Sequence, residues 1–159
     1  MIASATTGET MPAPISRHDR RLRAWTAFLR AHARIVRALE QELGDEQDMA
    51  LTDYDVLVQL ARAEPRRLRM SELADRLLLS RSGVTRLVDR LEASGLVERV
   101  SCDDDRRGQW AALTPAGEER LRRAAPTHLR GVAAHFLDRL SPDELAVVER
   151  IFTRLEDKG

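Results

Sequence analysis

The chain has 159 residues, of which 43% are hydrophobic and 33% are charged, so it can bury one core but is short for two independent domains. Its 26 basic and 26 acidic residues cancel, so overall charge favours neither nucleic acid nor a membrane surface as a partner. The single cysteine, Cys102, excludes an internal disulfide framework and a four-cysteine zinc site.

Residues 1–16 mix Thr, Ser, Gly and Pro, and we expect them to form a disordered arm. They lack the basic-then-apolar order of a secretory signal. No apolar run in the chain approaches the roughly 20 residues that a membrane-spanning helix requires. The sequence therefore predicts a soluble, cytoplasmic protein with no membrane partner.

A long first helix is predicted over residues 22–43. Its seam residues recur at alternating steps of three and four, and one histidine interrupts their apolar character: Leu22, Trp25, Leu29, His32, Val36, Leu39 and Leu43. Gly44 is expected to end this helix. Thr52 and Asp55 have the spacing of a capping box, so a second helix is predicted to begin at Thr52 and to end near Pro65.

Two short helices in close succession predict a helix-turn-helix. The first of them covers about residues 71–78. Ser80 is a natural N-cap for the second, and Gly95 stands where a left-handed C-terminal cap belongs. The core-facing residues of the second helix recur at i, i+3, i+4 and i+7: Val84, Leu87, Val88 and Leu91.

The hydrophobic period then changes to that of strands. Residues 96–102 and 109–113 are two β-prone runs on either side of the charged segment 103–108, which predicts a hairpin. Helices before and after one short hairpin give a fold that is mainly α with a small β wing.

The C-terminal third is predicted to form two more helices. Thr114 and Pro115 start the first, and Pro126 is expected to kink it. Its buried side is predicted at six positions: Leu121, Ala125, Leu129, Val132, Phe136 and Leu140. Ser141 and Glu144 form a second capping box, after which Leu145, Val148, Phe152 and Leu155 make a narrow seam.

The second helix of the helix-turn-helix is the first candidate for a DNA contact. With its apolar residues facing the core, the opposite stripe carries Ser82, Thr85, Arg86 and Asp89, with Arg81 and Arg90 on its borders. Hydroxyl groups beside arginines can contact phosphates and base edges, although any solvent-facing helix also carries such residues. Between residues 62 and 90 there are eight arginines against four acidic residues, which favours a nucleic-acid surface.

The tip of the hairpin is the second candidate. Arg106 and Arg107 stand on a turn from which a guanidinium can enter a minor groove. The three aspartates before them, residues 103–105, would repel phosphates, so we expect Asp105 to pair with one of the arginines. The alternative is a solvated turn, since Asp and Gly favour such bends.

The segment from Met70 to Gly117 resembles the MarR family of winged-helix regulators, in SELADRLLLSRSGVTRLVDRLEASGLVER followed by DRRGQWAALTPAG. The resemblance implies that Arg107 is the wing arginine of the minor groove, with Asp105 as its orienting partner. It also implies that Ser82, Thr85 and Arg86 are the contacts of the recognition helix.

The same resemblance implies a two-fold homodimer on a pseudo-palindromic operator, with repression as the family's usual mode. Residues 17–50 and 115–159 become dimerisation helices, and residues 51–114 become the winged DNA-binding region. A winged-helix module that binds an acidic protein in place of DNA is the alternative function.

Members of the family commonly release DNA when a small, often aromatic and anionic, compound binds. Trp25, His32, Tyr54 and Asp55 are the candidate ligand residues, since His32 shares a helix face with Trp25. Capping explains Asp55 equally well, and ordinary packing explains Trp25 and His32. No metal site or cofactor is predicted, because His128 and His135 lack a supporting Cys or carboxylate cluster.

No enzyme is predicted, because the sequence contains no nucleophile with its base, no glycine-rich phosphate loop and no metal-ligand motif. A redox switch at Cys102 is disfavoured as well. The neighbouring aspartates should raise the pKa of its thiol and so make it less reactive.

Overall fold

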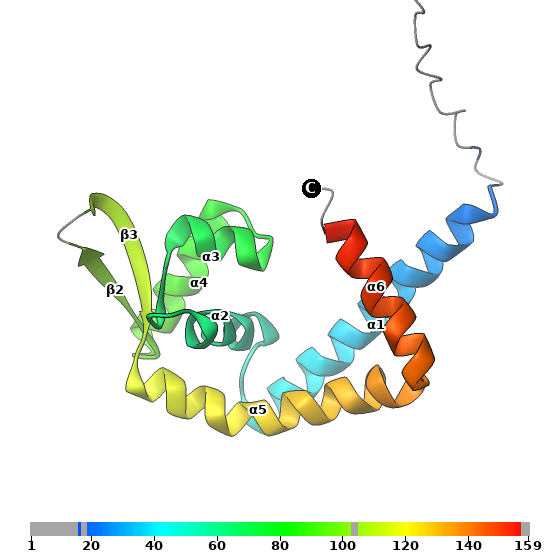
Figure 1. Cartoon of the computed structure of the whole chain (residues 1–159). Helices are drawn as coiled ribbons and strands as arrows, with labels where there is room; N and C mark the ends of the chain where they lie inside the picture. Colours follow the sequence, from blue (N-terminus) through cyan, green and yellow to red (C-terminus); the bar gives the residue numbers. More distant parts are fainter. Residues whose placement is uncertain (1–15, 17–18, 103–104, 157–159) are drawn as a thin grey trace, which may run out of the picture. The chain divides into compact units, whose positions relative to one another are not determined.

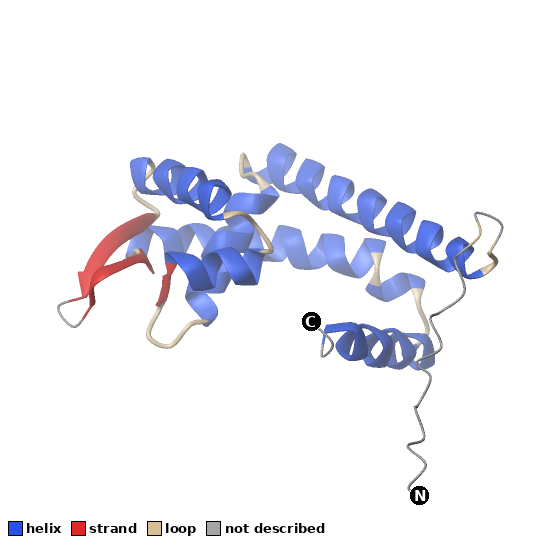
Figure 2. Cartoon of the chain, turned by 90° about the horizontal axis from the view of Figure 1, so that it is seen from above, coloured by secondary structure: helices blue, strands red, loops and turns tan. Residues whose placement is uncertain are grey.

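The computed structural model describes residues 16, 19–102 and 105–156, and of residues 102 and 105–108 it describes the backbone alone. The predicted fold class is confirmed: helices dominate, and one small antiparallel sheet lies among them (Figures 1 and 2). The elements follow in the order α1 (Arg21–Gln47), α2 (Leu51–Arg62), β1 (Arg67–Arg69), α3 (Met70–Leu77), α4 (Arg81–Ala93), β2 (Val97–Cys102), β3 (Asp105–Leu113), α5 (Pro115–His135), the 3-10 helix η1 (Leu137–Arg139) and α6 (Pro142–Glu156).

The chain divides into two compact units within α1, between Arg34 and Ile35. The core lies in the second unit and is built from the last turns of α1, from α2, α3 and α4, and from the sheet and α5. The predicted inner face of α4 is confirmed, because all four of its apolar residues are buried: Val84, Leu87, Val88 and Leu91. Burial of these side chains from water fixes which face of α4 points outward.

The three strands pair antiparallel in the order β1-β3-β2, and the hairpin of β2 and β3 was predicted. Leu68 of β1 lies opposite Ala111 of β3, and both side chains are buried. On the other face of the sheet, the guanidinium carbons of Arg67 and Arg69 lie 5.4 and 5.1 Å from the ring centroid of Trp110. The strand β1 was not predicted, because Leu68 is its only apolar residue.

The junction of α1 and α2 differs from the prediction. Gly44 does not end α1, which continues to Gln47 and gives way at Asp48, whose φ is 49°. A glycine inside a helix costs only about 1 kcal/mol relative to alanine, which burial of the nearby Leu39 and Leu43 can offset. Thr52 does not cap α2, because the helix starts at Leu51, whose backbone N–H donates to Glu40 Oε2 at 2.9 Å. A carboxylate from α1 thus takes over the capping role.

The predicted buried side of α5 is confirmed in part, since Leu121, Ala125 and Val132 are partly buried against the core. Its buried positions carry small residues, namely Gly117, Ala124, Thr127 and Gly131, whereas Leu129 is 62% exposed. A Cβ added at Gly131 would meet Leu39 of α1, so small residues are what allow the helices to approach so closely. The helix runs through Pro126 without ending there. The Thr114 cap is confirmed, with its Oγ1 accepting from the N–H of Gly117 at 3.0 Å.

Polar contacts reinforce the packing of α5 on α1. Thr127 Oγ1 lies 2.9 Å from Gln47 Nε2, and His135 Nε2 lies 2.6 Å from Glu42 Oε1. These contacts fix the part of α5 that leads away from the sheet toward η1 and α6 (Figure 1).

Helix α6 has the predicted capping box, in which Ser141 N donates to Glu144 Oε2 at 2.8 Å. None of its residues is buried. Its apolar side chains remain partly exposed, among them Val147 at 41% and Leu155 at 64%. None of the described helices has the length and apolar character needed to cross a membrane.

Candidate nucleic-acid interface

The turn between α3 and α4 leaves the N-terminus of α4 exposed to solvent. Ser80 is the predicted N-cap, and its Oγ accepts from the backbone N–H of Gly83 at 3.1 Å. Leu78, two residues earlier, adopts a left-handed conformation with φ at 54°, which makes the turn tight. At the other end, Gly95 has a φ of 71°, as the predicted left-handed cap requires.

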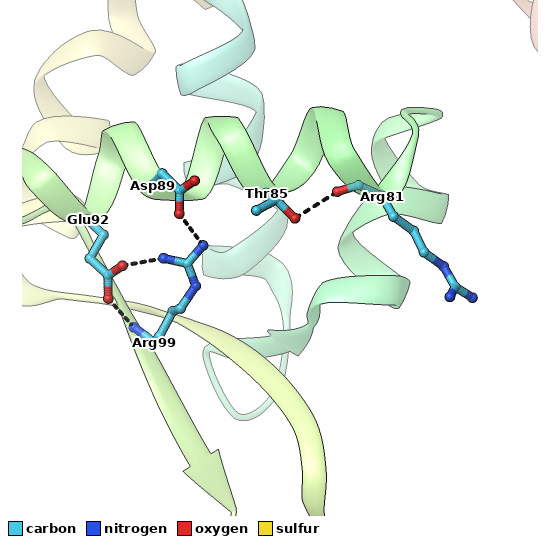
Figure 3. Close-up of polar contacts among 5 residues, drawn as sticks. All are labelled: Arg81, Thr85, Asp89, Glu92 and Arg99. Carbon is cyan, nitrogen blue, oxygen red and sulfur yellow. Dashed lines mark hydrogen bonds and ion pairs between the residues drawn. The ribbon is translucent and has the colours of Figure 1, made fainter.

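The outward face of α4 presents the predicted stripe. Ser82, Thr85, Arg86 and Asp89 are all exposed, and so is Arg81 at the first turn. Thr85 Oγ1 donates to the carbonyl of Arg81 at 2.9 Å, so its hydrogen is used within the helix and its oxygen stays available as an acceptor (Figure 3). Within the described part of the chain, no carboxylate pairs with Arg81 or Arg86.

Arg90, on the border of this stripe, already pairs with an acidic side chain. Its Nη2 contacts Asp53 Oδ1 of α2, and this hydrogen bond raises the pKa of the Arg90 guanidinium. The Asp53 side chain is 17% exposed, so the pair joins α4 to the inner part of the unit.

Arg99 of β2 makes a contact that sequence reasoning missed. Its guanidinium pairs with Asp89 and Glu92, both on α4, and its backbone N–H donates to Glu92 Oε1 at 3.1 Å (Figure 3). The signal lay in the alternation of β2: Arg99 is two residues after buried Val97 and so shares the sheet face that α4 covers.

The hairpin of the wing is confirmed, but its bounds differ from the prediction. Strand β3 begins at Asp105, so residues 105–108 belong to the strand and not to the predicted turn, and Cys102 lies opposite Asp105 at the end of the ladder. The side chains of Asp105, Arg106 and Arg107 lie outside the described part, and so do Asp103 and Asp104 altogether. Their roles at the tip stay predictions.

The predicted ligand residues lie in the two units, which we describe separately. In α1, Phe28 stands between Trp25 and His32, with ring centroids 5.9 and 6.0 Å away. In α2, the buried Tyr54 stacks on His128 with centroids 4.4 Å apart. Burial lowers the pKa of the His128 imidazole, so this ring favours its neutral form.

Asp55 is not the helix cap suggested by its spacing. Burial and, second, the nearby charge of Glu40 raise the pKa of its carboxyl group. His128 and His135 have separate partners, Tyr54 and Glu42. In the described ranges no group of three or more His, Cys, Asp or Glu side chains could hold a metal ion.

A tight turn, an exposed helix after it and a hairpin beside that helix define a winged helix-turn-helix protein. Residues 47–108 match the model of the MarR family. The chain is 31% identical over 128 residues to the HTH-type transcriptional regulator YkoM of Bacillus subtilis, with 79% of each chain covered.

Two solved structures from Streptomyces coelicolor are similar over nearly the whole chain. AbsC, a MarR family transcriptional regulator, superposes with a TM-score of 0.84 at 32% identity, covering 91% of this chain and 97% of AbsC. Sco3205, a MarR family regulator solved in complex with DNA, gives 0.83 at 34% identity, covering 92% and 91%. The chain belongs to the MarR family, which is a family of transcriptional regulators and not of enzymes.

Proposed function

We propose that this chain is a repressor that binds double-stranded DNA as a homodimer at a pseudo-palindromic operator. The observation that carries the proposal is the exposed face of α4, which offers Ser82, Thr85 and Arg86 beside a capped helix N-terminus. The relative Sco3205, at 34% identity, is solved in complex with DNA.

In this proposal α4 enters a major groove about 12 Å wide, with its first two turns toward the base edges. Arg86 reads a base or holds a phosphate, and Thr85 offers an acceptor. The open N-terminus of α4 attracts a phosphate, because backbone N–H groups point out of it. Arg107 on the wing enters the minor groove, and Asp105 orients it.

The homodimer is supported by the apolar side chains that α6 leaves partly exposed. Val147, Ile151 and Leu155 recur at four-residue steps, which puts them on one side of the helix. Exposed apolar side chains of this kind favour burial in a second copy of the chain. A two-fold axis between two such copies would present two α4 helices to a palindrome.

A small aromatic ligand that releases the DNA is part of the proposal, with Trp25, His32, Tyr54 and Asp55 as its contacts. Support comes from the ring of Tyr54 in α2, which lies against the ring of His128 in α5 with centroids 4.4 Å apart, so that two aromatic side chains meet there. The carboxyl groups of Asp55 and Glu40 disfavour an anion beside them, so we infer that the aromatic part of the ligand lies at Tyr54.

Replacement of Arg86 with Ala tests the role of α4. We expect operator binding to weaken by about 1 to 3 kcal/mol and preference to relax at one position per half-site. Fluorescence anisotropy with operator and scrambled duplexes measures both effects. The matched control is Arg123→Ala, which removes the same charge from an exposed position of α5. Equal losses in the two variants would rule out a specific role for Arg86.

Replacement of Arg107 with Ala tests the wing. We expect weaker binding with an unchanged dimer, and an unaltered binding curve would refute the assignment. The alternative function, a protein-binding module, is separated by a gel shift at low ionic strength, where such a module would retard no DNA fragment.

A further inference from the structure

The exposed face of α4 changes character along the helix. Its first two turns carry Arg81, Thr85 and Arg86, whereas its third turn carries Asp89 and Glu92. The Asp89 side chain is 57% exposed. A free carboxylate on a face that approaches DNA would meet the negative charge of the phosphates and weaken binding.

The wing supplies a cation at this point. Arg99 Nη2 lies 2.5 Å from Asp89 Oδ1, and the Nη1 of the same guanidinium contacts Glu92 Oε2. The Arg99 side chain is only 25% exposed. Because strand β2 holds its backbone and two carboxylates hold its guanidinium, the cation stays beside Asp89 at little further cost in entropy (Figure 3).

We propose that Arg99 is a positioning residue for DNA binding, which neutralises Asp89 and so lets the outward face of α4 approach a phosphate backbone. The inference rests on the proposed function. One guanidinium against two carboxylates leaves a single net negative charge that Asp89 and Glu92 share, and without Arg99 the two would carry two negative charges. The same contacts tie β2 to α4, so the wing supplies charge to the helix beside it.

A double-mutant cycle separates this role from the alternatives. Arg99→Met keeps much of the alkyl stem and removes the charge, and Asp89→Asn removes the carboxylate that Arg99 neutralises. Affinity is measured by anisotropy with a labelled duplex that the wild-type chain retains. Cooperative unfolding is recorded for every variant, and Arg99→Gln, which can still hydrogen-bond Glu92, replaces Arg99→Met if that variant loses its transition.

We expect Arg99→Met to weaken DNA binding about tenfold at low salt, and less at high salt because the repulsion is screened. Adding Asp89→Asn should restore affinity to within about threefold of wild type. In the presence of Arg99, Asp89→Asn alone should change affinity by less than about threefold, since that carboxylate is already neutralised.

Three results would overturn the proposal. The first is that Arg99→Met binds DNA as tightly as wild type. The second is that Arg99→Met binds weakly and Asp89→Asn restores none of the affinity, as a purely mechanical role of Arg99 requires. The third is that Asp89→Asn raises the affinity equally with and without Arg99, as an unpaired charge on Asp89 requires. Failure of the proposed function itself is visible earlier, because the wild-type chain would then retain no duplex at low ionic strength.

Discussion

Helices α4 and α6 are both amphipathic, yet only α4 buries its apolar side chains within one chain. The four apolar side chains of α4 are buried, and its polar face points outward. Helix α6 has no buried residue at all, and Val147, Ile151 and Leu155 remain partly exposed. The difference indicates that one chain is enough to cover the apolar face of α4, whereas α6 needs something to cover it.

The largest expected effect comes from disrupting the packing beside the winged region, in which the apolar face of α4 is buried. A Cβ at Gly117 would lie 2.1 Å from the carbonyl oxygen of Leu96, where the backbone cannot move easily. We expect Gly117→Ala to lower the free energy of unfolding by about 3 kcal/mol, measured by urea denaturation.

Gly44 provides the matched control for that substitution. Nothing lies within 4 Å of a Cβ built there, and the residue sits inside α1 with an ordinary helical backbone. Gly44→Ala should raise the free energy of unfolding by about 0.5 to 1 kcal/mol. Equal effects of the two substitutions would contradict the packing described for the start of α5.

The next largest effect concerns α6, whose apolar side chains remain partly exposed. Replacing Ile151 with Asp puts a charge on the apolar side of α6, and we expect the dimer dissociation constant to rise about a hundredfold. Sedimentation at several concentrations measures it, and Arg150→Asp, at an exposed polar position of the same helix, is the control. A monomeric wild-type chain, or no shift for Ile151→Asp, would show that another partner covers α6.

The smallest expected effect is a pH dependence at the junction of α2 and α5. The pKa of His128 is lowered by burial, so below its ordinary value of about 6.5 the unfolded chain takes up a proton that the folded chain resists. Stability should therefore fall as pH drops below that value. His128→Phe keeps a ring against Tyr54 and should flatten the curve in this window; an equally steep curve would exclude His128 as the cause.

Local signals account for what the sequence predicted well. The N-cap at Ser80, the apolar period of α4 and the left-handed Gly95 all act within a few residues, so they fix the outward stripe. Contacts between neighbouring elements account for the misses. The cap of α2 comes from Glu40 on α1, and Arg99 of β2 pairs with Asp89 on α4, so the spacing within one element identifies neither partner.

Close packing explains the remaining error. In α5 the apolar pattern located residues that are only partly buried, whereas the buried positions include Gly131, where a Cβ would meet Leu39, and Gly117, where it would meet Leu96. No hydrophobic period reveals such small residues. The seam predicted on α6 was Leu145, Val148, Phe152 and Leu155, and none of these residues is buried in one chain. The exposed Val147 and Ile151 lie outside that seam.

The most direct test is to incubate the purified chain with random duplex DNA and to sequence the fragments that it retains. An outward α4 in each subunit of a two-fold dimer predicts an inverted repeat whose half-sites lie about 10 base pairs apart, centre to centre. Retained fragments with no common motif, or with a single half-site, would contradict sequence reading by paired α4 helices.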